Sequence, residues 1–139
     1  MPAEPLCALT LEGRAEPGCL DRVHDLVEQL WQRVPGVQPS DRYRFETAVI
    51  EVAGNIVEHG GPGVRMRLLL LVHPDRVEAH FCDTGCAVEP QATAGRLPEP
   101  LAEAGRGIAL ARAAVDELAY ARTGATNWWH VLKQRTPTD

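Results

Sequence analysis

The sequence has no excess of basic residues and no long apolar run. Its 14 lysines and arginines are outnumbered by 19 aspartates and glutamates, which gives a formal net charge of −5. This balance argues against a nucleic-acid partner, because nucleic-acid-binding domains usually carry a basic patch. No apolar run approaches the roughly 20 residues that a membrane-spanning helix needs. We therefore expect neither direct contact with nucleic acid nor insertion in a membrane.

We expect no secretory signal, and the sequence contains no paired cysteine motif. The first ten residues, MPAEPLCALT, contain no basic segment followed by an apolar one, so we expect a cytoplasmic location. None of the four cysteines forms a CxxC pair, which leaves little support for a zinc knuckle. Free thiols in a reducing compartment are the favoured interpretation. The alternative is a metal site at HFCDTGC (His80, Cys82 and Cys86), although the first two residues also fit alternate positions of a strand.

Length and composition predict one domain. A chain of 139 residues suits a single core, and 45% hydrophobic with 24% charged residues is ordinary for a globular protein. The sequence shows no internal repeat and no boundary between two domains. The predicted domain is therefore the whole chain, residues 1–139, with an ordered core of about residues 6–134.

Apolar periodicity predicts three helices and four strands. Apolar residues at helical spacing mark each helix, and short alternating or apolar runs mark each strand. Proline and glycine end the first two helices, and PSD at residues 39–41 is expected to supply capping oxygens to the second. The expected helices are residues 17–34, 40–59 and 107–119, and the expected strands are residues 6–12, 64–73, 76–83 and 127–133.

The order of these elements predicts the fold class. A strand, two helices, two strands, a helix and a final strand suit an α+β two-layer sandwich, with helices on one face of a mixed sheet. Between the last helix and the strand before it, residues 87–106 contain three prolines and show no periodicity. A structureless segment of this length is uncommon in a small domain and is often a lid. We therefore expect residues 87–106 to close over a ligand.

A polar stripe runs along the second expected helix, in the segment IEVAGNIVEHGG at residues 50–61. Helix residues four apart share a face, so Glu51 and Asn55 lie together, and Glu58 continues the line. The apolar stripe of the same helix lies roughly opposite. Taken alone, the polar stripe is most simply a solvated helix face.

Three short segments follow the polar stripe in chain order. In CDTG, Asp83 at a strand end can accept a hydrogen bond from a ligand amino group, while Gly85 lets the backbone come close. In AGRGIAL, Gly105 and Gly107 lie where a helix begins, and free amides with the helix dipole favour a phosphate there. In GATNWW, Thr126 precedes the last strand. Each segment alone is weak evidence, and the signal comes from their order and spacing together.

These segments resemble the motifs of a known family. RFETAVIEVAGNIVEHG, CDTG, GRGIALARAAVDEL and GAT…VLK are similar to the asparagine, first-glycine, second-glycine and terminal threonine motifs of Bergerat-fold ATPases. The closest resemblance is to the small anti-sigma factor serine/threonine kinases of bacterial partner-switching systems, and it covers about residues 6–134. The resemblance implies a histidine-kinase-like ATPase domain with the Bergerat-type ATP-binding fold.

The resemblance implies a role for each site residue, with ATP and Mg²⁺ as the cofactors. Asn55 would coordinate Mg²⁺, which prefers oxygen ligands and also bridges phosphates. Glu51 would be the general base that deprotonates a substrate serine or polarises a water. Asp83 would accept the adenine amino group, Gly85 would let the ring approach, and Thr126 would bond near the adenine. The residues that would hold the phosphates under the lid are Gly105, Arg106 and Gly107.

The resemblance also implies partners. The expected substrate is a STAS-type anti-anti-sigma protein, and the chain would bind a sigma factor or another regulatory target in alternation with it. The family likeness further suggests a homodimer. A histidine kinase is disfavoured, because 139 residues leave no room for a phospho-accepting histidine on a dimerising helix.

Two positions depart from the family pattern. Ala87 stands where the family commonly has the second glycine of DxGxG, and its methyl group is expected to crowd the nucleotide or alter the hinging of the lid. The terminal Gly-Thr pair is spread to Gly124-Ala125-Thr126, which leaves the threonine assignment open by one residue. The first departure motivates an alternative function, a non-catalytic ATP-binding module that switches partners.

Overall fold

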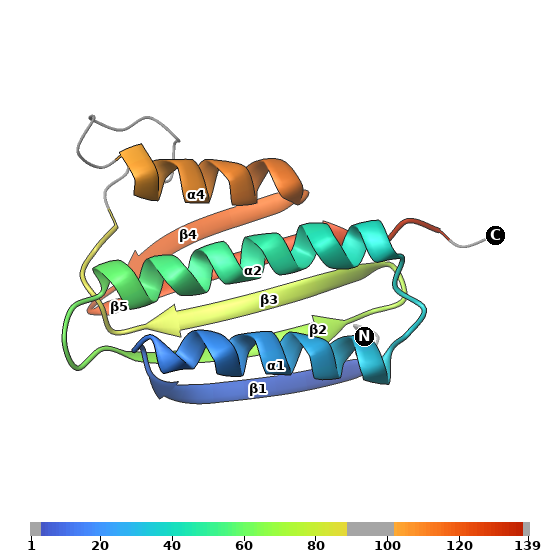
Figure 1. The fold of residues 1–139 in the computed structure, drawn as a ribbon, viewed down its shortest axis with the longest axis horizontal. Coiled ribbons are helices and arrows are strands. Elements are labelled where there is room, and N and C mark those ends of the chain that lie inside the picture. The colour runs from blue at the N-terminus through green and yellow to red at the C-terminus, as the bar shows by residue number, and fades with distance from the viewer. Residues whose placement is uncertain (1–3, 89–101, 138–139) are drawn as a thin grey trace.

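The computed structural model describes residues 4–88 and 102–137. The helices and strands follow one another along the chain largely in the expected order, and Figure 1 shows them in one view. The described elements are β1 (Cys7–Arg14), α1 (Gly18–Arg33), α2 (Pro39–His59), β2 (Arg65–Val72), β3 (Arg76–Asp83), α4 (Ala102–Ala114), β4 (Glu117–Thr123) and β5 (Thr126–Gln134).

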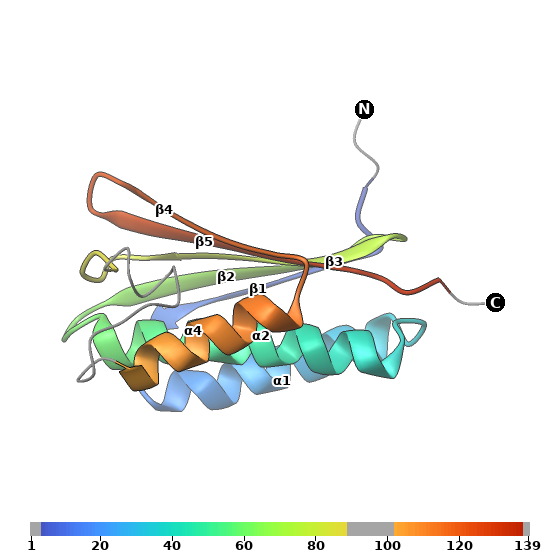
Figure 2. The ribbon, with the colours of Figure 1, turned by 90° about the horizontal axis from the view of Figure 1, so that it is seen from above.

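The described strands form one sheet in the order β1-β2-β3-β5-β4. The helices α1, α2 and α4 pack on the same face of this sheet, as Figure 2 shows from above. This arrangement confirms the predicted α+β two-layer sandwich. Each of the four pairings is antiparallel, whereas the prediction had a mixed sheet. Two of these pairings are tight hairpins, β2–β3 and β4–β5, whose strands must run antiparallel.

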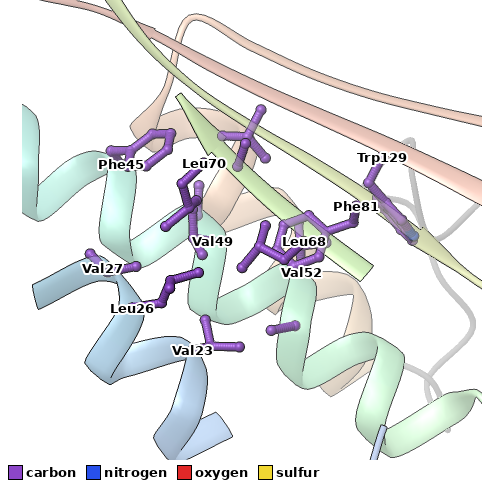
Figure 3. Packing of buried hydrophobic residues seen from close by; sticks show 14 of the residues in the cluster. Val23, Leu26, Val27, Phe45, Val49, Val52, Leu68, Leu70, Phe81 and Trp129 are labelled. Carbon is purple, nitrogen blue, oxygen red and sulfur yellow. The ribbon is translucent and has the colours of Figure 1, made fainter. Parts of the chain in front are cut away.

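The core lies between the sheet and the helices (Figure 3). Side chains of a strand alternate between its two faces, so every second residue of β2 and β3 points at the helices. Leu68, Leu70 and Phe81 therefore meet the apolar stripes of α1 and α2. Phe45 of α2 and Trp129 of β5 are also buried, and full burial of a large apolar side chain contributes about 1.5–3 kcal/mol. This packing fixes α2, which carries the polar stripe, on the sheet.

The start of α2 differs from the prediction. The helix begins at Pro39, and its cap residue Gln38 makes no side-chain cap hydrogen bond. Proline suits the first helical position, because an N–H there would have no partner within the helix. Asp41 therefore lies inside the first turn, and its buried carboxylate accepts hydrogen bonds from the backbone N–H of Thr136 at 2.6 Å and from the Thr136 hydroxyl at 3.0 Å. The predicted capping role is wrong, and Asp41 instead ties the C-terminal segment to α2.

The chain after α4 also differs from the prediction, which extended that helix to residue 119. The helix ends at Ala114, and the following residues form β4, a strand that the sequence analysis missed. Leu118 is buried in β4 opposite Val131 of β5. Its spacing from the apolar residues before it fits a helix. In β4, Leu118 and the half-buried Tyr120 lie two residues apart with an exposed residue between them, which fits a strand. A two-residue turn containing Gly124, at φ 60°, joins β4 to β5.

The structure describes only part of the expected lid. Residues 102–106 of the expected lid belong to α4, and residues 89–101 lie outside the described residues. The closing of this segment over a ligand therefore stays a prediction.

Within residues 4–88 and 102–137, no helix is both long and apolar enough to cross a membrane.

Candidate functional site

The polar stripe of α2 meets α4 at Glu51. The two helices lie side by side (Figure 1), and Glu51 and Asn55 are both half-buried. A methyl group added at Gly107 of α4 would overlap the carboxylate oxygen Oε2 of Glu51. A residue without a side chain at this position therefore gives the Glu51 carboxylate its place against α4. Glu58 is exposed, so the sheltered part of the stripe is Glu51 with Asn55.

The predicted phosphate-binding segment lies inside α4. The helix begins at Ala102, five residues before the expected start, so Gly105, Arg106 and Gly107 lie in its first two turns. Only the first four amides of a helix have no partner within it. Arg106 and Gly107 are the fifth and sixth residues of α4, so this segment does not offer the free amides at Gly107 that were expected where the helix begins. The contact at Gly107 places the second turn of α4 beside Glu51.

Asp83 lies at the end of β3 and is only 3% exposed. Its Oδ1 accepts hydrogen bonds from the backbone N–H of Gly85 and from the Asn127 amide nitrogen, each at 2.9 Å. Its Oδ2 accepts a longer hydrogen bond from Nε1 of Trp129, at 3.3 Å. An ionised carboxylate offers about four acceptor sites, so Oδ2 can accept one more donor. Asp83 is therefore firmly oriented and still able to receive a ligand amino group.

Gly85 packs backbone to backbone against Gly60, the residue that caps the C-terminus of α2. A Cβ atom at Gly85 would lie 2.9 Å from the Gly60 Cα and 3.2 Å from the Gly60 carbonyl oxygen. The loop after β3 and the end of α2 can meet this closely only without a side chain at Gly85. The structure thus brings the predicted first-glycine segment to the same end of the domain as the end of α2.

Asn127 belongs to this site, although the sequence analysis missed it. The residue is 1% exposed, and its amide nitrogen donates to Asp83 and, at 2.9 Å, to the carbonyl oxygen of Cys86. Its amide oxygen accepts hydrogen bonds from the Tyr120 hydroxyl and, at 2.8 Å, from Nη1 of Arg122. Asn127 therefore links β3, β4, β5 and the loop after β3. The available signal was a polar residue directly before the two tryptophans at residues 128 and 129.

The position of Asn127 bears on the predicted role of Thr126. Asn127 is the residue directly opposite Asp83 in the pairing of β3 with β5. Side chains alternate along a strand, so Asn127 shares a face with Asp83, whereas Thr126 belongs to the other face. The structure therefore brings Asn127, and not Thr126, to Asp83. The bond of Thr126 near the adenine stays a prediction.

The loop after β3 is held at two points by side chains of β4. Arg122 of β4 donates from Nη1 to the carbonyl oxygen of Gly85 at 3.0 Å, and the backbone N–H of Val88 donates to the Tyr120 hydroxyl at 3.0 Å. Ala87, which replaces the usual second glycine, lies in this loop and is exposed. Its methyl group therefore fits the loop in the present arrangement of the described residues.

The residues at the α2–α4 contact fit a magnesium ion chemically. Asn55 offers an amide oxygen on the face of α2 that also carries Glu51. Mg²⁺ prefers oxygen ligands and commonly takes only one or two from the protein, with waters and phosphate oxygens completing its shell. The donor set on α2 is thus sufficient for an ion that arrives with a nucleotide.

Comparisons with known proteins identify the domain. The sequence profile of the family described as the histidine kinase-like ATPase domain matches residues 13–131, which is more than half of the chain. No curated protein matches the sequence.

Two solved structures share the fold. One contains the RsbU and RsbW domains of Rv1364c from Mycobacterium tuberculosis; it is 18% identical, has a TM-score of 0.66, and aligns with 94% of this chain. The present chain spans about a third of that structure, 33% of its length. The other is the nucleotide-free catalytic domain of the histidine kinase ThkA, 10% identical with a TM-score of 0.57, covering 94% of this chain and 99% of the domain. These likenesses confirm the Bergerat-type ATPase fold.

Proposed function

The chain belongs to the histidine kinase-like ATPase domain family, and we propose that it is an ATP-dependent serine/threonine protein kinase. In this proposal it acts as an anti-sigma factor in a partner-switching system and phosphorylates a STAS-type antagonist. The observation that carries the proposal is the placement of Glu51, half-buried against Gly107, with Asn55 one helical turn further on the same face. The structural likeness to a chain that contains an RsbW domain agrees with it.

We assign the adenine to the end of the domain where Asp83 lies. The orientation of Asp83 by Gly85, Asn127 and Trp129 supports this assignment, because a fixed acceptor can select an amino group. Gly85 would allow the ring to approach the backbone, and Asn127 or Thr126 would bond near the ring. The phosphates would then extend along α2 toward the start of α4, to the segment of Gly105, Arg106 and Gly107.

The proposed reaction transfers the terminal phosphoryl group of ATP to a serine hydroxyl of the partner. A bond forms between the serine oxygen and the γ-phosphorus, the bond from that phosphorus to the bridging oxygen breaks, and ADP leaves. Glu51 accepts the hydroxyl proton, and a positioned base typically contributes about 10²- to 10⁴-fold in rate. The ion held through Asn55 would supply charge neutralisation on the phosphates.

A second candidate is a non-catalytic ATP-binding module that switches partners. Ala87 favours it, because the family commonly has glycine there and the loop is already held by Arg122 and Tyr120. In either case we propose that a sigma factor or another regulatory target binds in alternation with the STAS-type protein. A cytoplasmic location and a homodimer are further parts of the proposal.

Phosphate transfer from labelled ATP to a co-encoded STAS protein separates the two candidates. The wild type should transfer phosphate, and Glu51→Gln, which keeps the shape but removes the charge, should be slower by at least about 10². Glu51→Gln should still bind Mg-ATP within about threefold of the wild type, less than 1 kcal/mol. If the wild type binds ATP but transfers no phosphate to any co-encoded partner, the module is the better description. A Glu51→Gln variant as fast as the wild type would remove Glu51 from the mechanism.

A further inference from the structure

The sheet face opposite the helices carries a cluster of one carboxylate and two imidazoles. Glu78 and His80 lie two residues apart on β3, and His130 of β5 is paired directly with His80. Residues two apart on a strand share a face, so the three side chains converge on the open face of the sheet. Figure 2 shows that α1, α2 and α4 all cover the other face. The cluster is therefore separate from the nucleotide site.

The geometry of the cluster suits a single metal ion. Nε2 of His130 lies 2.8 Å from Oε1 of Glu78, and Nε2 of His80 lies 3.7 Å from the same oxygen. One ligand atom from each residue lies within 4.8 Å of the other two. Zinc–nitrogen and zinc–oxygen bonds of about 2.0–2.2 Å place tetrahedral ligand atoms roughly 3.3–3.5 Å apart. The observed distances span that value, so an ion could enter with small side-chain movements.

The carboxylate of Glu78 is held in the orientation that a ligand needs. Its other oxygen, Oε2, accepts a hydrogen bond from Nε of Arg76 at 3.1 Å and lies 3.3 Å from Nε2 of His73. Oε1 is left facing His80 and His130, whose rings are stacked with centroids 4.5 Å apart. Metal-binding carboxylates are commonly fixed by such hydrogen bonds outside the coordination sphere.

The three side chains also influence one another's protonation. Burial and the nearby charge of His130 lower the pKa of His80. Burial alone would raise the pKa of Glu78, but the hydrogen bond from His130 and the charge of Arg76 outweigh it and lower the pKa. Glu78 is therefore ionised at neutral pH.

We propose that Glu78, His80 and His130 form a surface site for one divalent ion of the zinc class, with the fourth coordination position open to solvent. Two imidazole nitrogens and one carboxylate oxygen suit Zn²⁺, whereas Mg²⁺ prefers a shell of oxygen atoms alone. His80 and His130 are 43% and 29% exposed at their side chains, so an ion can reach them. The positive charge of Arg76 lies beside Glu78 and weakens cation binding.

The site differs from the one that the HFCDTGC segment suggested. His80 is a member of both sites, but the other two residues are Glu78 and His130 instead of Cys82 and Cys86. Among residues 4–88 and 102–137, this is the only group of three side chains close enough to share a metal ion. Cys82 lies two residues from His80 on the same strand and face, so a thiol is the main competing ligand. The test must therefore separate imidazole ligands from thiol ligands.

Calorimetric titration of Zn²⁺ into the full, metal-stripped chain without nucleotide tests the proposal. The wild type should bind one ion, and His80→Gln and His130→Gln should each weaken binding at least about tenfold. Replacing a residue that only supports a metal ligand already weakens binding by about 10- to 100-fold. His24→Gln is the matched control, because His24 lies 3.9 Å from Glu46 without forming part of a group of three. This control and Cys82→Ser should bind Zn²⁺ like the wild type.

Two results would overturn the proposal. One is equal Zn²⁺ affinity for the wild type and both histidine variants, and the other is loss of binding in Cys82→Ser. Circular dichroism should first show that each variant is folded. A second measurement uses the wild type alone: with Co²⁺ in place of Zn²⁺, a thiolate-to-cobalt charge-transfer band would also contradict the assignment, and its absence alongside visible Co²⁺ absorption would support it. None of these results depends on ATP binding or kinase activity.

Discussion

Replacing Gly107 by alanine tests the contact between α2 and α4. The added methyl group would overlap Oε2 of Glu51, which is the far end of a flexible side chain, so the carboxylate can turn away. Inside a helix, alanine is more favourable than glycine by about 0.8–1.0 kcal/mol. We therefore expect the free energy of unfolding of Gly107→Ala to lie between the wild-type value and about 1 kcal/mol above it. The Glu51 side chain should at the same time lose its position against α4.

The rate of phosphate transfer should change in the opposite direction. A displaced base loses part of a contribution of about 10²- to 10⁴-fold, so transfer by Gly107→Ala should fall at least about tenfold. Gly54→Ala is the matched control, because Gly54 lies inside α2 and a Cβ there meets no atom within 4 Å. Gly54→Ala should gain similar stability without displacing Glu51. Urea denaturation and single-turnover transfer measure the two quantities, and a stable Gly107→Ala with the wild-type rate would refute the reasoning.

Two further predictions concern stability. Gly85→Ala should lower the free energy of unfolding by about 1–3 kcal/mol, because its methyl group would meet the backbone of Gly60, and an unchanged urea midpoint would contradict the close packing. Burial alone would raise the pKa of Asp41, but hydrogen bonds from Thr136 and the charge of Lys133 outweigh it and lower the pKa. Because the pKa of Asp41 is lower in the folded than in the unfolded protein, its ionised carboxylate stabilises the fold at pH values above the unfolded pKa. This stabilisation is lost as the pH falls below about 4, the pKa of an unperturbed aspartate. Stability measured from pH 6 downward should therefore fall more steeply in the wild type than in Asp41→Asn, and parallel curves would count against the role of Asp41.

The parts of the fold that the sequence predicted are those with strong periodicity and clear end signals. The apolar stripe of α2 is long and ends at consecutive glycines, so its bounds could be placed within one residue. The hairpin of β2 and β3 was equally clear, because two apolar runs flank the turn at Pro74-Asp75. Local sequence was sufficient in both cases, since neighbouring residues determine helical spacing and turn geometry.

The parts that the sequence did not predict depend on contacts between distant segments. The role of Asn127 comes from its register opposite Asp83, and a register between strands 44 residues apart cannot be derived from local pattern. Asp41 has the right residue type for a helix cap, and its partner Thr136 lies 95 residues away. The end of α4 was misplaced because Leu118 fits a helical period as well as an alternating one, and pairing with β5 decides between them.

The contact between Glu51 and Gly107 was predicted from the sequence only in part. The sequence predicted that each residue belongs to a ligand site, because a polar stripe and a glycine segment occur in a recognisable order. Their closeness could not be derived without knowing that α2 and α4 lie side by side (Figure 1). The structure thus turns two separate sequence motifs into one local arrangement.

Calorimetric titration of ATP into the wild type and Asn55→Ala, each with and without Mg²⁺, tests the nucleotide site most directly. Because Asn55 would hold the ion that bridges the phosphates, the variant should bind Mg-ATP at least about tenfold more weakly, a loss of about 1.4 kcal/mol. The two proteins should differ much less without Mg²⁺. Glu58→Gln, at an exposed position on the same helix, is the control and should bind Mg-ATP like the wild type. Equal affinities of the wild type and Asn55→Ala under both conditions would contradict the site.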